Sequence, residues 1–256
     1  MMTRLLENVG SFVLEKIEWV GSVILLLAAA VKELRRPLRL RHIFAQMSHL
    51  GVDSLAIVAL TMLFTGMVMT LQIAHEFIRF GAQSTIGGVV AIAIGRELGP
   101  VLVGVVCAGR VGSAITAEIS TMKVTEQIDA LRVMATSPIG YLVVPRMIAC
   151  MCMVPLLTVF GDVIGVFGGW FVATQYAHIA SYTFTSSIDL FVVPHDVAGG
   201  LVKAAVFGVV IAVLGAWYGL HAPEGAEGVG RATTRSGVAA IVVIFFLNVF
   251  LSFLLY

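Results

Sequence analysis

The stretch "AIAIGRELGPVLVGVVCAGR", residues 91–110, places an arginine and a glutamate side by side in an apolar run long enough to cross a lipid bilayer. An ionised side chain at the centre of a bilayer costs at least about 2.5 kcal/mol, so such residues almost always face other protein or a water-filled cavity. Arg96 and Glu97 therefore predict a bundle of helices in which each of them finds a partner on another segment.

The composition of the whole chain is that of a membrane protein. Hydrophobic residues make up 59% and charged residues 12% of its 256 positions, whereas charged residues are about 25% of a typical soluble domain. The formal net charge of +1 leaves no basic surplus for a nucleic-acid partner. Three cysteines fall in apolar runs and are predicted to be buried and reduced: Cys107, Cys150 and Cys152.

Five segments are apolar over about 20 residues, the length that a helix needs to cross a bilayer: 52–74, 86–108, 147–173, 197–220 and 237–255. A shorter apolar stretch, "WVGSVILLLAAAV" (19–31), follows charged residues, which indicates a helix lying in the membrane interface; a sixth crossing is the alternative. The predicted fold is an all-α integral membrane protein with an N-terminal interfacial helix and five transmembrane helices. Residues 1–45 form the interfacial helix and a basic segment, and 46–256 the five-helix domain.

The positive charges between the spans predict the orientation. Thirteen Lys and Arg residues lie in 1–51, 109–146 and 221–236, and one lies in the alternate segments 75–85 and 174–196. Because Lys and Arg are enriched in cytoplasmic loops, the N-terminus is expected in the cytoplasm and the C-terminus outside.

The cytoplasmic segment between the second and third spans, "SAITAEISTMKVTEQIDALRVMA" (113–135), has helical periodicity. Apolar positions such as Ile115 and Ile119 share one side, and charged residues populate the rest: Glu118, Lys123, Glu126, Asp129 and Arg132. Two interpretations remain open at this point, a solvated surface helix and a helix that docks a cytoplasmic partner.

The intramembrane polar residues are Arg96, Glu97, Asp162, Lys203 and Asn248. Neighbouring residues point about 100° apart around a helix, so Arg96 and Glu97 cannot pair with each other. Counting about 1.5 Å per residue from the span ends places all of them near the midplane except Lys203, which is nearer the outer face. We expect Arg96 to pair with Asp162, and Glu97 with Asn248 or Lys203, as a packing or hinge contact. The alternative is an ion- or proton-coupled secondary transporter that uses Glu97 and Asp162.

The sequence contains no motif for covalent chemistry. It has no G-x-x-x-x-G-K-[ST] phosphate loop, no Ser-His-Asp arrangement and no metal-binding H-x-x-x-H spacing. We therefore expect a non-catalytic subunit without a cofactor or a metal.

The run "RELGPVLVGVVCAGRVGSAITAEISTMKVTEQIDALRVM" resembles the signature of MlaE (YrbE-type) permeases. The similarity continues through "PRMIACMCMVPLLTVFGDVIGVFGGW" and ends in "GVGRATTRSGV". Such proteins are membrane subunits of ABC-type phospholipid transport systems that include an MCE-domain protein. Some relatives carry an acid at the position of Asn248, so the resemblance leaves a salt bridge between Lys203 and the fifth span in doubt.

The resemblance implies a homodimer in the bacterial inner membrane that moves phospholipids to or from a periplasmic MCE hexamer and so maintains outer-membrane lipid asymmetry. A cytoplasmic ABC ATPase, which binds the ATP, would dock on the helix at about 113–135, and a STAS-domain subunit often accompanies it. Lipid would occupy an outward-open pocket lined by the outer part of the first span, "GMVMTLQIAHEFIRF" (66–80). The wall candidates there are Met67, Met69, Leu71, Ile73, Phe77 and Phe80.

Overall fold

All regular secondary structure is helical within residues 2–35 and 40–256, the part of the chain that this computed structural model describes. Five helical segments there are long and apolar enough to cross a membrane: Leu40–Arg79, Gln83–Val124, Ile139–Gln175, Pro194–Leu220 and Gly225–Leu255. Each contains one of the predicted spans. The prediction of an all-α integral membrane protein with five transmembrane helices is confirmed.

The spans are built from both single and compound helices. The first, fourth and fifth spans are α2 (Leu40–Arg79), α9 (Pro194–Leu220) and α10 (Gly225–Leu255). The second runs without a break through η1 (Gln83–Thr85), α3 (Ile86–Ala93), η2 (Ile94–Leu98), α4 (Gly99–Cys107), η3 (Ala108–Gly112) and α5 (Ser113–Val124). The third consists of η4 (Ile139–Val143) and α7 (Val144–Gln175), while α6 (Gln127–Val133) and α8 (Ser181–Phe191) lie in the connections.

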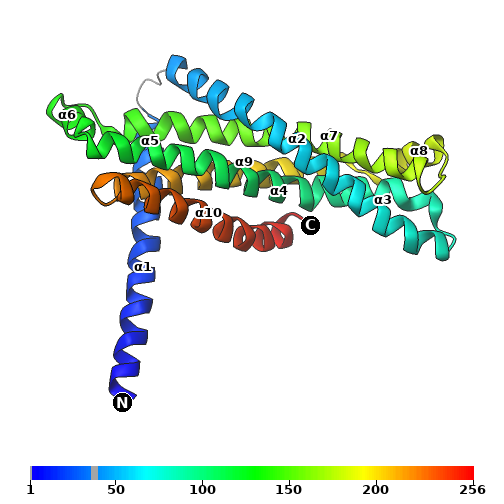
Figure 1. Cartoon of the computed structure of the whole chain (residues 1–256), viewed down its shortest axis with the longest axis horizontal. Coiled ribbons are helices and arrows are strands. Elements are labelled where there is room, and N and C mark those ends of the chain that lie inside the picture. The colour runs from blue at the N-terminus through cyan, green and yellow to red at the C-terminus, as the bar shows by residue number, and fades with distance from the viewer. Residues whose placement is uncertain (1, 36–39) are drawn as a thin grey trace.

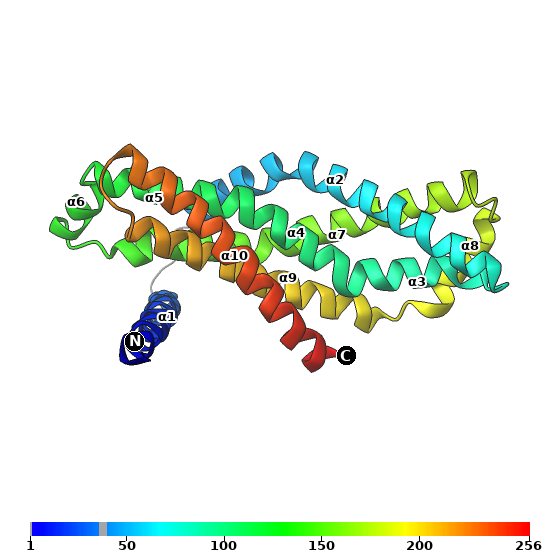
Figure 2. The same ribbon diagram turned by 60° about the horizontal axis from the view of Figure 1, so that its bottom comes forward.

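The spans form one elongated bundle with two distinct ends (Figure 1). One end, called here the α6 end, carries α6, the end of α5 and the start of α10; the other, the α8 end, carries α3 and α8 (Figures 1 and 2). Among the five spans, α9 has the most buried apolar window and α10 the least. The core therefore surrounds α9, and α10 covers it from outside.

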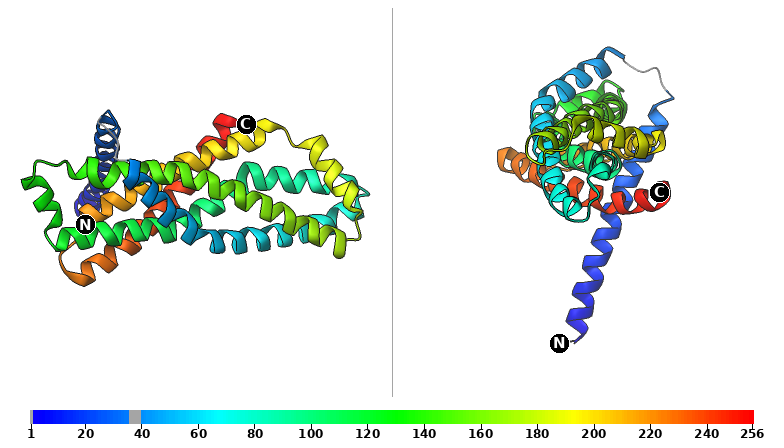
Figure 3. Two further views of the ribbon diagram at one scale, coloured as in Figure 1. Left: turned by 90° about the horizontal axis from the view of Figure 1, so that it is seen from above. Right: turned by 90° about the vertical axis from the view of Figure 1, so that its right-hand side faces the viewer.

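Helix α1 (Met2–Glu33) runs across the long axis of the bundle (Figures 1 and 3). It packs through Leu26 and Ala30, which are buried, and through the Trp19 ring, whose centroid lies 6.2 Å from that of Trp217. Another face of α1 is apolar but exposed: Val13, Ile17, Val20 and Ile24. A helix that crosses the bundle and bares an apolar face has the character of an interfacial helix. Residues 36–39 of the basic segment lie outside the described residues.

Helices α2 and α7 approach each other closely. A Cβ atom added at Gly66 would lie 1.8 Å from the carbonyl oxygen of Gly165, so the two backbones touch. Small residues of this kind allow membrane helices to approach closely and gain packing contacts.

We expect Gly66→Val to destabilise the protein by about 1–3 kcal/mol, the usual effect of overfilling a packed site. The added side chain must push α2 away from α7 because the clash is with backbone. Thermal unfolding of the purified protein in detergent measures the change. Gly21→Val is the control, since no atom lies within 4 Å of a Cβ at Gly21; equal melting temperatures for the two variants would contradict the proposed contact.

The predicted single helix over 113–135 is wrong. Helix α5 ends at Val124, and Glu126 adopts a left-handed backbone conformation with φ of 58° before α6 begins. The Nζ of Lys123 donates to the carbonyl oxygen of Ala222 at 2.8 Å, which holds the end of α5 against the α9–α10 connection. A left-handed residue just past a helix end is a common C-terminal cap, and periodicity does not reveal it.

The cysteine prediction is correct for two of the three residues. Cys107 and Cys150 are buried and free, but Cys152 is free and exposed. Residues two apart on a helix point to nearly opposite sides, so Cys150 and Cys152 cannot both face the core.

Candidate functional site

The turn that carries Arg96 and Glu97 is a π turn, η2, which lies just before Pro100. In a regular α-helix the N–H of residue 100 would bond to the carbonyl oxygen of Arg96, but proline has no N–H. The freed carbonyl accepts a hydrogen bond from the Nζ of Lys203 at 3.1 Å. Wide turns of this kind often occur at functional sites, and Pro100 is the sequence signal for this one.

Glu97 is the centre of a polar cluster that joins the second span to α9 and α10. Its carboxylate accepts hydrogen bonds from Lys203 Nζ at 2.7 Å and from Asn248 Nδ2 at 2.9 Å. Both predicted partners of Glu97 are therefore confirmed. The hydroxyl of Ser252 lies 2.8 Å from one carboxylate oxygen of Glu97 and 3.1 Å from the other. Sequence analysis missed Ser252, although it lies one helical turn after Asn248.

The ammonium group of Lys203 is completely satisfied. Its side chain is 0% exposed, and its three donors reach the Glu97 carboxylate, the Arg96 carbonyl and the Ser252 hydroxyl, the last at 2.8 Å. A buried charge is tolerated only with this degree of pairing and hydrogen bonding. The fifth span contributes a hydroxyl to Lys203 instead of a carboxylate, so the ion pair of Lys203 is with Glu97.

Arg96 does not pair with Asp162, and that prediction is wrong. The Nη2 and Nε atoms of Arg96 lie 2.7 and 2.9 Å from Oδ1 of Asp196, whose side chain is 3% exposed. The Arg96 guanidinium also lies 4.8 Å from the ring centre of Tyr256, and the Tyr256 hydroxyl donates to the backbone oxygen of Asp196 at 2.9 Å. The predicted fourth span began at residue 197, so Asp196 was assigned to the preceding loop. In the structure Asp196 is the third residue of α9.

The position of Arg96 along the bundle follows from its partners. They are the first turn of α9 and the residue that follows α10. The second span and α9 are therefore offset along their axes. Arg96 is level with one end of α9.

Asp162 is packed apart from the polar cluster. A Cβ atom at Gly99 would lie 1.8 Å from Oδ1 of Asp162, so this carboxyl group rests on the start of α4. Within the described residues, Oδ1 has no hydrogen-bond partner. None of the hydrogen bonds of Glu97 leads to Asp162, so the two acids predicted for an ion relay are not connected.

The residues predicted to form the lipid wall do not share one face. Five of them lie on two faces of α2, and Phe80 is the residue that follows this helix. Ile73 and Phe77 pack against the core, whereas Leu71 and Phe80 are exposed to 42% and 81%. Leu71 also lines a hollow of about 550 Å³ at the α8 end, together with Gln72, Ala74, His75, Glu76, Ile78, Tyr176 and Ala177. Met67 and Met69 are half-buried. The six assignments stay predictions.

An apolar stripe on α2, interrupted by His75 after Leu71, is exposed in the described protomer. It consists of Ile57, Leu60, Phe64, Val68, Leu71 and Ile78. Their spacing of three or four residues, or of two turns, places them on one side of the helix. We call this set the α2 stripe.

The charged residues predicted for docking divide into structural and exposed groups. Glu118 pairs at 2.6 Å with Arg146, whose side chain is 5% exposed, and this pair ties α5 to α7. In α6, by contrast, Asp129 and Arg132 pair with each other at 2.8 Å and are both well exposed. Val133 and Met134, at the end of α6, are exposed to 87% and 65%. The α6 end therefore presents an apolar tip beside charged residues.

Comparison with known families identifies the chain. The family model described as permease MlaE matches residues 43–254, which include the polar cluster, the α2 stripe and α6. The chain belongs to the MlaE permease family. The resemblance found in the sequence is confirmed.

Similar proteins place this MlaE permease among ABC transporter permeases. It is 48% identical to a probable ABC transporter permease protein of Synechocystis over 84% of its own length and 82% of the relative's. It is 43% identical to a probable ABC transporter permease protein of Rickettsia felis over 97% and 96% of the two chains. The chloroplastic Arabidopsis thaliana protein TRIGALACTOSYLDIACYLGLYCEROL 1 is 36% identical over 91% of this chain and 67% of the relative.

The MlaE permease is thus the multi-pass membrane component of an ABC transporter. Because permeases of this class work with an ATPase, an ATPase is its partner. Within the described residues, no cluster of His, Cys, Asp and Glu is arranged to hold a metal ion.

Proposed function

We propose that this permease moves phospholipids between the bacterial inner membrane and a periplasmic channel of MCE-domain proteins, driven by ATP that a separate subunit binds and hydrolyses. The observation that carries the proposal is the α2 stripe, which leads along the bundle to the hollow at the α8 end. An apolar path that is open to the side suits an amphiphile entering from a bilayer. The Arabidopsis relative supports a lipid as the substrate, since its name is that of a glycerolipid with a sugar headgroup.

A second copy of the chain would complete the lipid pocket. An exposed apolar stripe of this length marks a lipid- or protein-facing surface. Two copies meeting along α2 would enclose the hollow at the α8 end between them, with Leu71 and Phe80 on its inner wall. We therefore propose a homodimer whose pocket opens at the α8 end.

The distribution of positive charge supports the orientation. With Lys and Arg enriched on the cytoplasmic side, the α6 end would face the cytoplasm and the α8 end the periplasm. The apolar tip of α6, Val133 and Met134, would enter a groove on the ABC ATPase, to which a STAS-domain subunit would bind. The MCE hexamer would meet the α8 end.

The continuous second span would connect the ATPase-docking helix α6 to the lipid pocket at the α8 end. Residues 83–124 form one uninterrupted helical segment that reaches from the α8 end to α5, directly before α6. Movement of α6 on ATP binding would be transmitted along this segment to Arg96 and Glu97. The π turns η2 and η3 are the places at which such a helix bends most easily. Closure at the level of Arg96 would narrow the pocket and expel the lipid.

The test of this proposal is lipid transfer by the reconstituted complex. We expect Leu71→Arg to reduce ATP-dependent transfer of a fluorescent phospholipid about tenfold or more, because a charge in the apolar path costs at least about 2.5 kcal/mol. Leu25→Arg is the control, since Leu25 is 71% exposed on α1, which carries no part of the α2 stripe or of the α8 end.

Two results would contradict the proposal. Equal transfer by both variants would remove the α2 stripe from the lipid path. Transfer that continues without ATP and follows a pH gradient would favour the secondary transporter with Glu97 and Asp162.

A further inference from the structure

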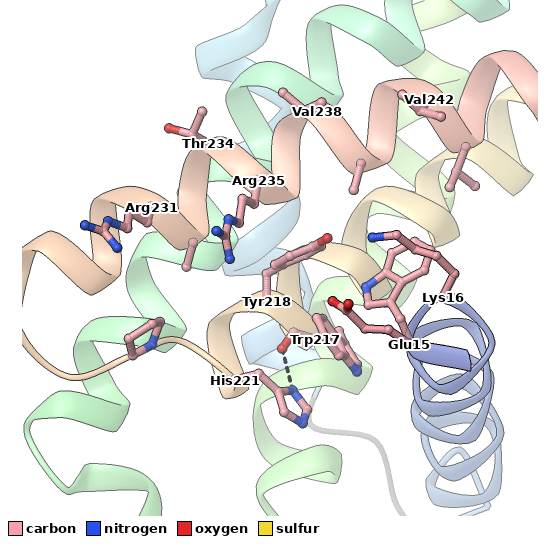
Figure 4. Close-up of a pocket in the computed structure, with 15 residues that line it drawn as sticks. Glu15, Lys16, Trp217, Tyr218, His221, Arg231, Thr234, Arg235, Val238 and Val242 are labelled. Carbon is pink, nitrogen blue, oxygen red and sulfur yellow. Dashed lines mark hydrogen bonds between the residues drawn. The ribbon is translucent and has the colours of Figure 1, made fainter. Parts of the chain in front are cut away.

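A second hollow lies at the opposite end of the molecule, between α1, the end of α9 and the first half of α10 (Figure 4). Its volume is about 770 Å³, and we call it the α1–α10 groove. It is separate from the α2 stripe and from the polar cluster around Glu97. Volumes of about 300–1,000 Å³ are typical of small-molecule sites.

The wall that α10 contributes changes from basic to aliphatic along its length. The lining residues of this helix are Arg231, Ala232, Thr234, Arg235, Val238, Ala239, Val242 and Val243. Both arginines precede all four aliphatic residues from Val238 onward, which lie deeper in the span. At a rise of about 1.5 Å per residue, Arg235 and Val242 are about 10 Å apart along the helix. The groove therefore has a charged mouth and an apolar floor, as an amphiphile has a headgroup and chains.

Positive charge prevails at the mouth. Lys16, Arg231 and Arg235 line it against one acid, Glu15. Arg231 is ion-paired with Glu227 on its own helix. In the described part of the chain no ion pair is found for Arg235, and its side chain points toward Tyr218 (Figure 4). Among the three basic residues of the mouth, Arg235 is therefore the best placed to bind an anionic group of a ligand.

Aromatic side chains cover the side of the groove that faces α1. Trp19 of α1 and Trp217 and Tyr218 of α9 all line it, and the ring of His221 stacks on that of Trp217 with centroids 4.4 Å apart. Trp and Tyr are enriched at the level of lipid headgroups, where one end of the ring is apolar and the other is hydrated. Basic pockets between membrane helices at this level bind anionic headgroups.

We propose that the α1–α10 groove is a binding site for an anionic phospholipid of the leaflet at the α6 end. Arg235, with Lys16 and Arg231, holds the phosphate-containing headgroup, and one acyl chain lies along Val238 and Val242. The lipid fills the space between α1 and α10 and fixes α1 to the bundle. This site is distinct from the transport pocket, and its existence does not depend on which lipid the protein transports.

Tryptophan fluorescence can report on the site directly. The chain has three tryptophans, of which Trp19 and Trp217 line the groove and Trp170 lies on α7 near α8. In the full-length Trp170→Phe protein, phosphatidylglycerol with brominated acyl chains should quench the remaining emission at about five-fold lower concentration than brominated phosphatidylcholine, the effect of about one cation. Arg235→Gln should remove this preference, and Arg235→Lys should keep most of it.

Two controls separate the site from general charge and from surface lipid. Arg79→Gln removes an exposed arginine at the α8 end, paired with Glu76, and should leave the preference unchanged. Ala239→Phe narrows the apolar floor and should weaken quenching by both lipids. Equal quenching by the two lipids in the starting protein, or an unchanged preference in Arg235→Gln, would overturn the proposal.

Two further outcomes would also overturn it. Glycerol phosphate competing as strongly as the lipid would mean a site for free phosphate, because the acyl chains would then contribute nothing. A changed oligomeric state in Ala239→Phe, measured by native mass spectrometry, would mean that a second copy of the chain covers the groove.

Discussion

Replacing Glu97 by alanine is expected to lower the free energy of unfolding by up to about 3–5 kcal/mol, the effect of leaving a buried charge without its partner; the Glu97 side chain itself is 39% exposed. The reason lies with Lys203, which is 0% exposed and would keep its charge without a carboxylate partner. Ser252 and the Arg96 carbonyl would remain as acceptors, but neither carries a formal charge. Chemical unfolding of the purified protein in detergent measures the loss.

The paired variant Glu97→Leu with Lys203→Met distinguishes packing from a hinge. Apolar replacement of a whole buried ion pair is often neutral or stabilising, so stability should return close to that of the parent protein. If the cluster only packs the spans together, lipid transfer should return as well. If it is a hinge contact, the double variant should be stable but inactive.

Glu76→Ala is the matched control for the single variant Glu97→Ala, because Glu76 and its partner Arg79 are both exposed. A loss in that variant equal to the loss in Glu97→Ala would contradict the role of burial.

Val133→Glu is expected to weaken binding of the ATPase at least about tenfold and to reduce ATP-driven lipid transfer in proportion. Val133 is 87% exposed, and truncating or charging a residue at the centre of an interface commonly costs about 2 kcal/mol or more. Co-purification of the ATPase with the permease, and the rate of ATP hydrolysis, measure the effect. Phe80→Glu is the control for ATPase binding and hydrolysis alone, since Phe80 is 81% exposed at the α8 end, far from α6 but on the proposed lipid wall.

Charge reversal is informative at Asp129 but not at Glu118. Among residues 2–35 and 40–256, Asp129 pairs with exposed Arg132 on its own helix, and exposed pairs of this kind contribute about 0.2–1 kcal/mol. Asp129→Lys should therefore fold normally and lose ATPase binding. Glu118 holds the buried Arg146, so its reversal would disturb the α5–α7 contact directly. Normal ATPase binding by both Val133→Glu and Asp129→Lys would exclude α6 as the docking surface.

The sequence was sufficient to predict the spans because hydropathy reports burial in lipid directly. The partners of Glu97 were predictable for a similar reason, since few polar groups are available in the spans. The partner of Arg96 was not, because counting depth from apolar runs assumes that the runs are aligned across the bundle. The second span and α9 are offset, so that Arg96 meets Asp196 in the first turn of α9 instead of Asp162.

Local backbone features also escaped prediction. The π turn at Ile94–Leu98 rotates the side chains that follow it relative to their directions in a regular α-helix. A count based on regular helical geometry therefore does not describe this turn. The left-handed turn at Glu126 lies next to a contact between Lys123 and Ala222, which are 99 residues apart in the chain, and sequence periodicity predicts neither. The division of Met67 through Phe80 into buried and exposed residues likewise depends on where α7 lies.

At the α8 end the second span extends past the start of α9, because Arg96 is level with the first turn of α9, and we call this extension the rim. If the start of α9 marks the surface of the bilayer, residues 83–95 of the second span rise about 20 Å above it, accompanied by α8 and the ends of α2 and α7 (Figure 3). A lipid leaving through the pocket would then climb this rim inside a protein wall, with its chains shielded from water along the way. The receiving channel could meet the lipid at the top of the rim without touching the membrane.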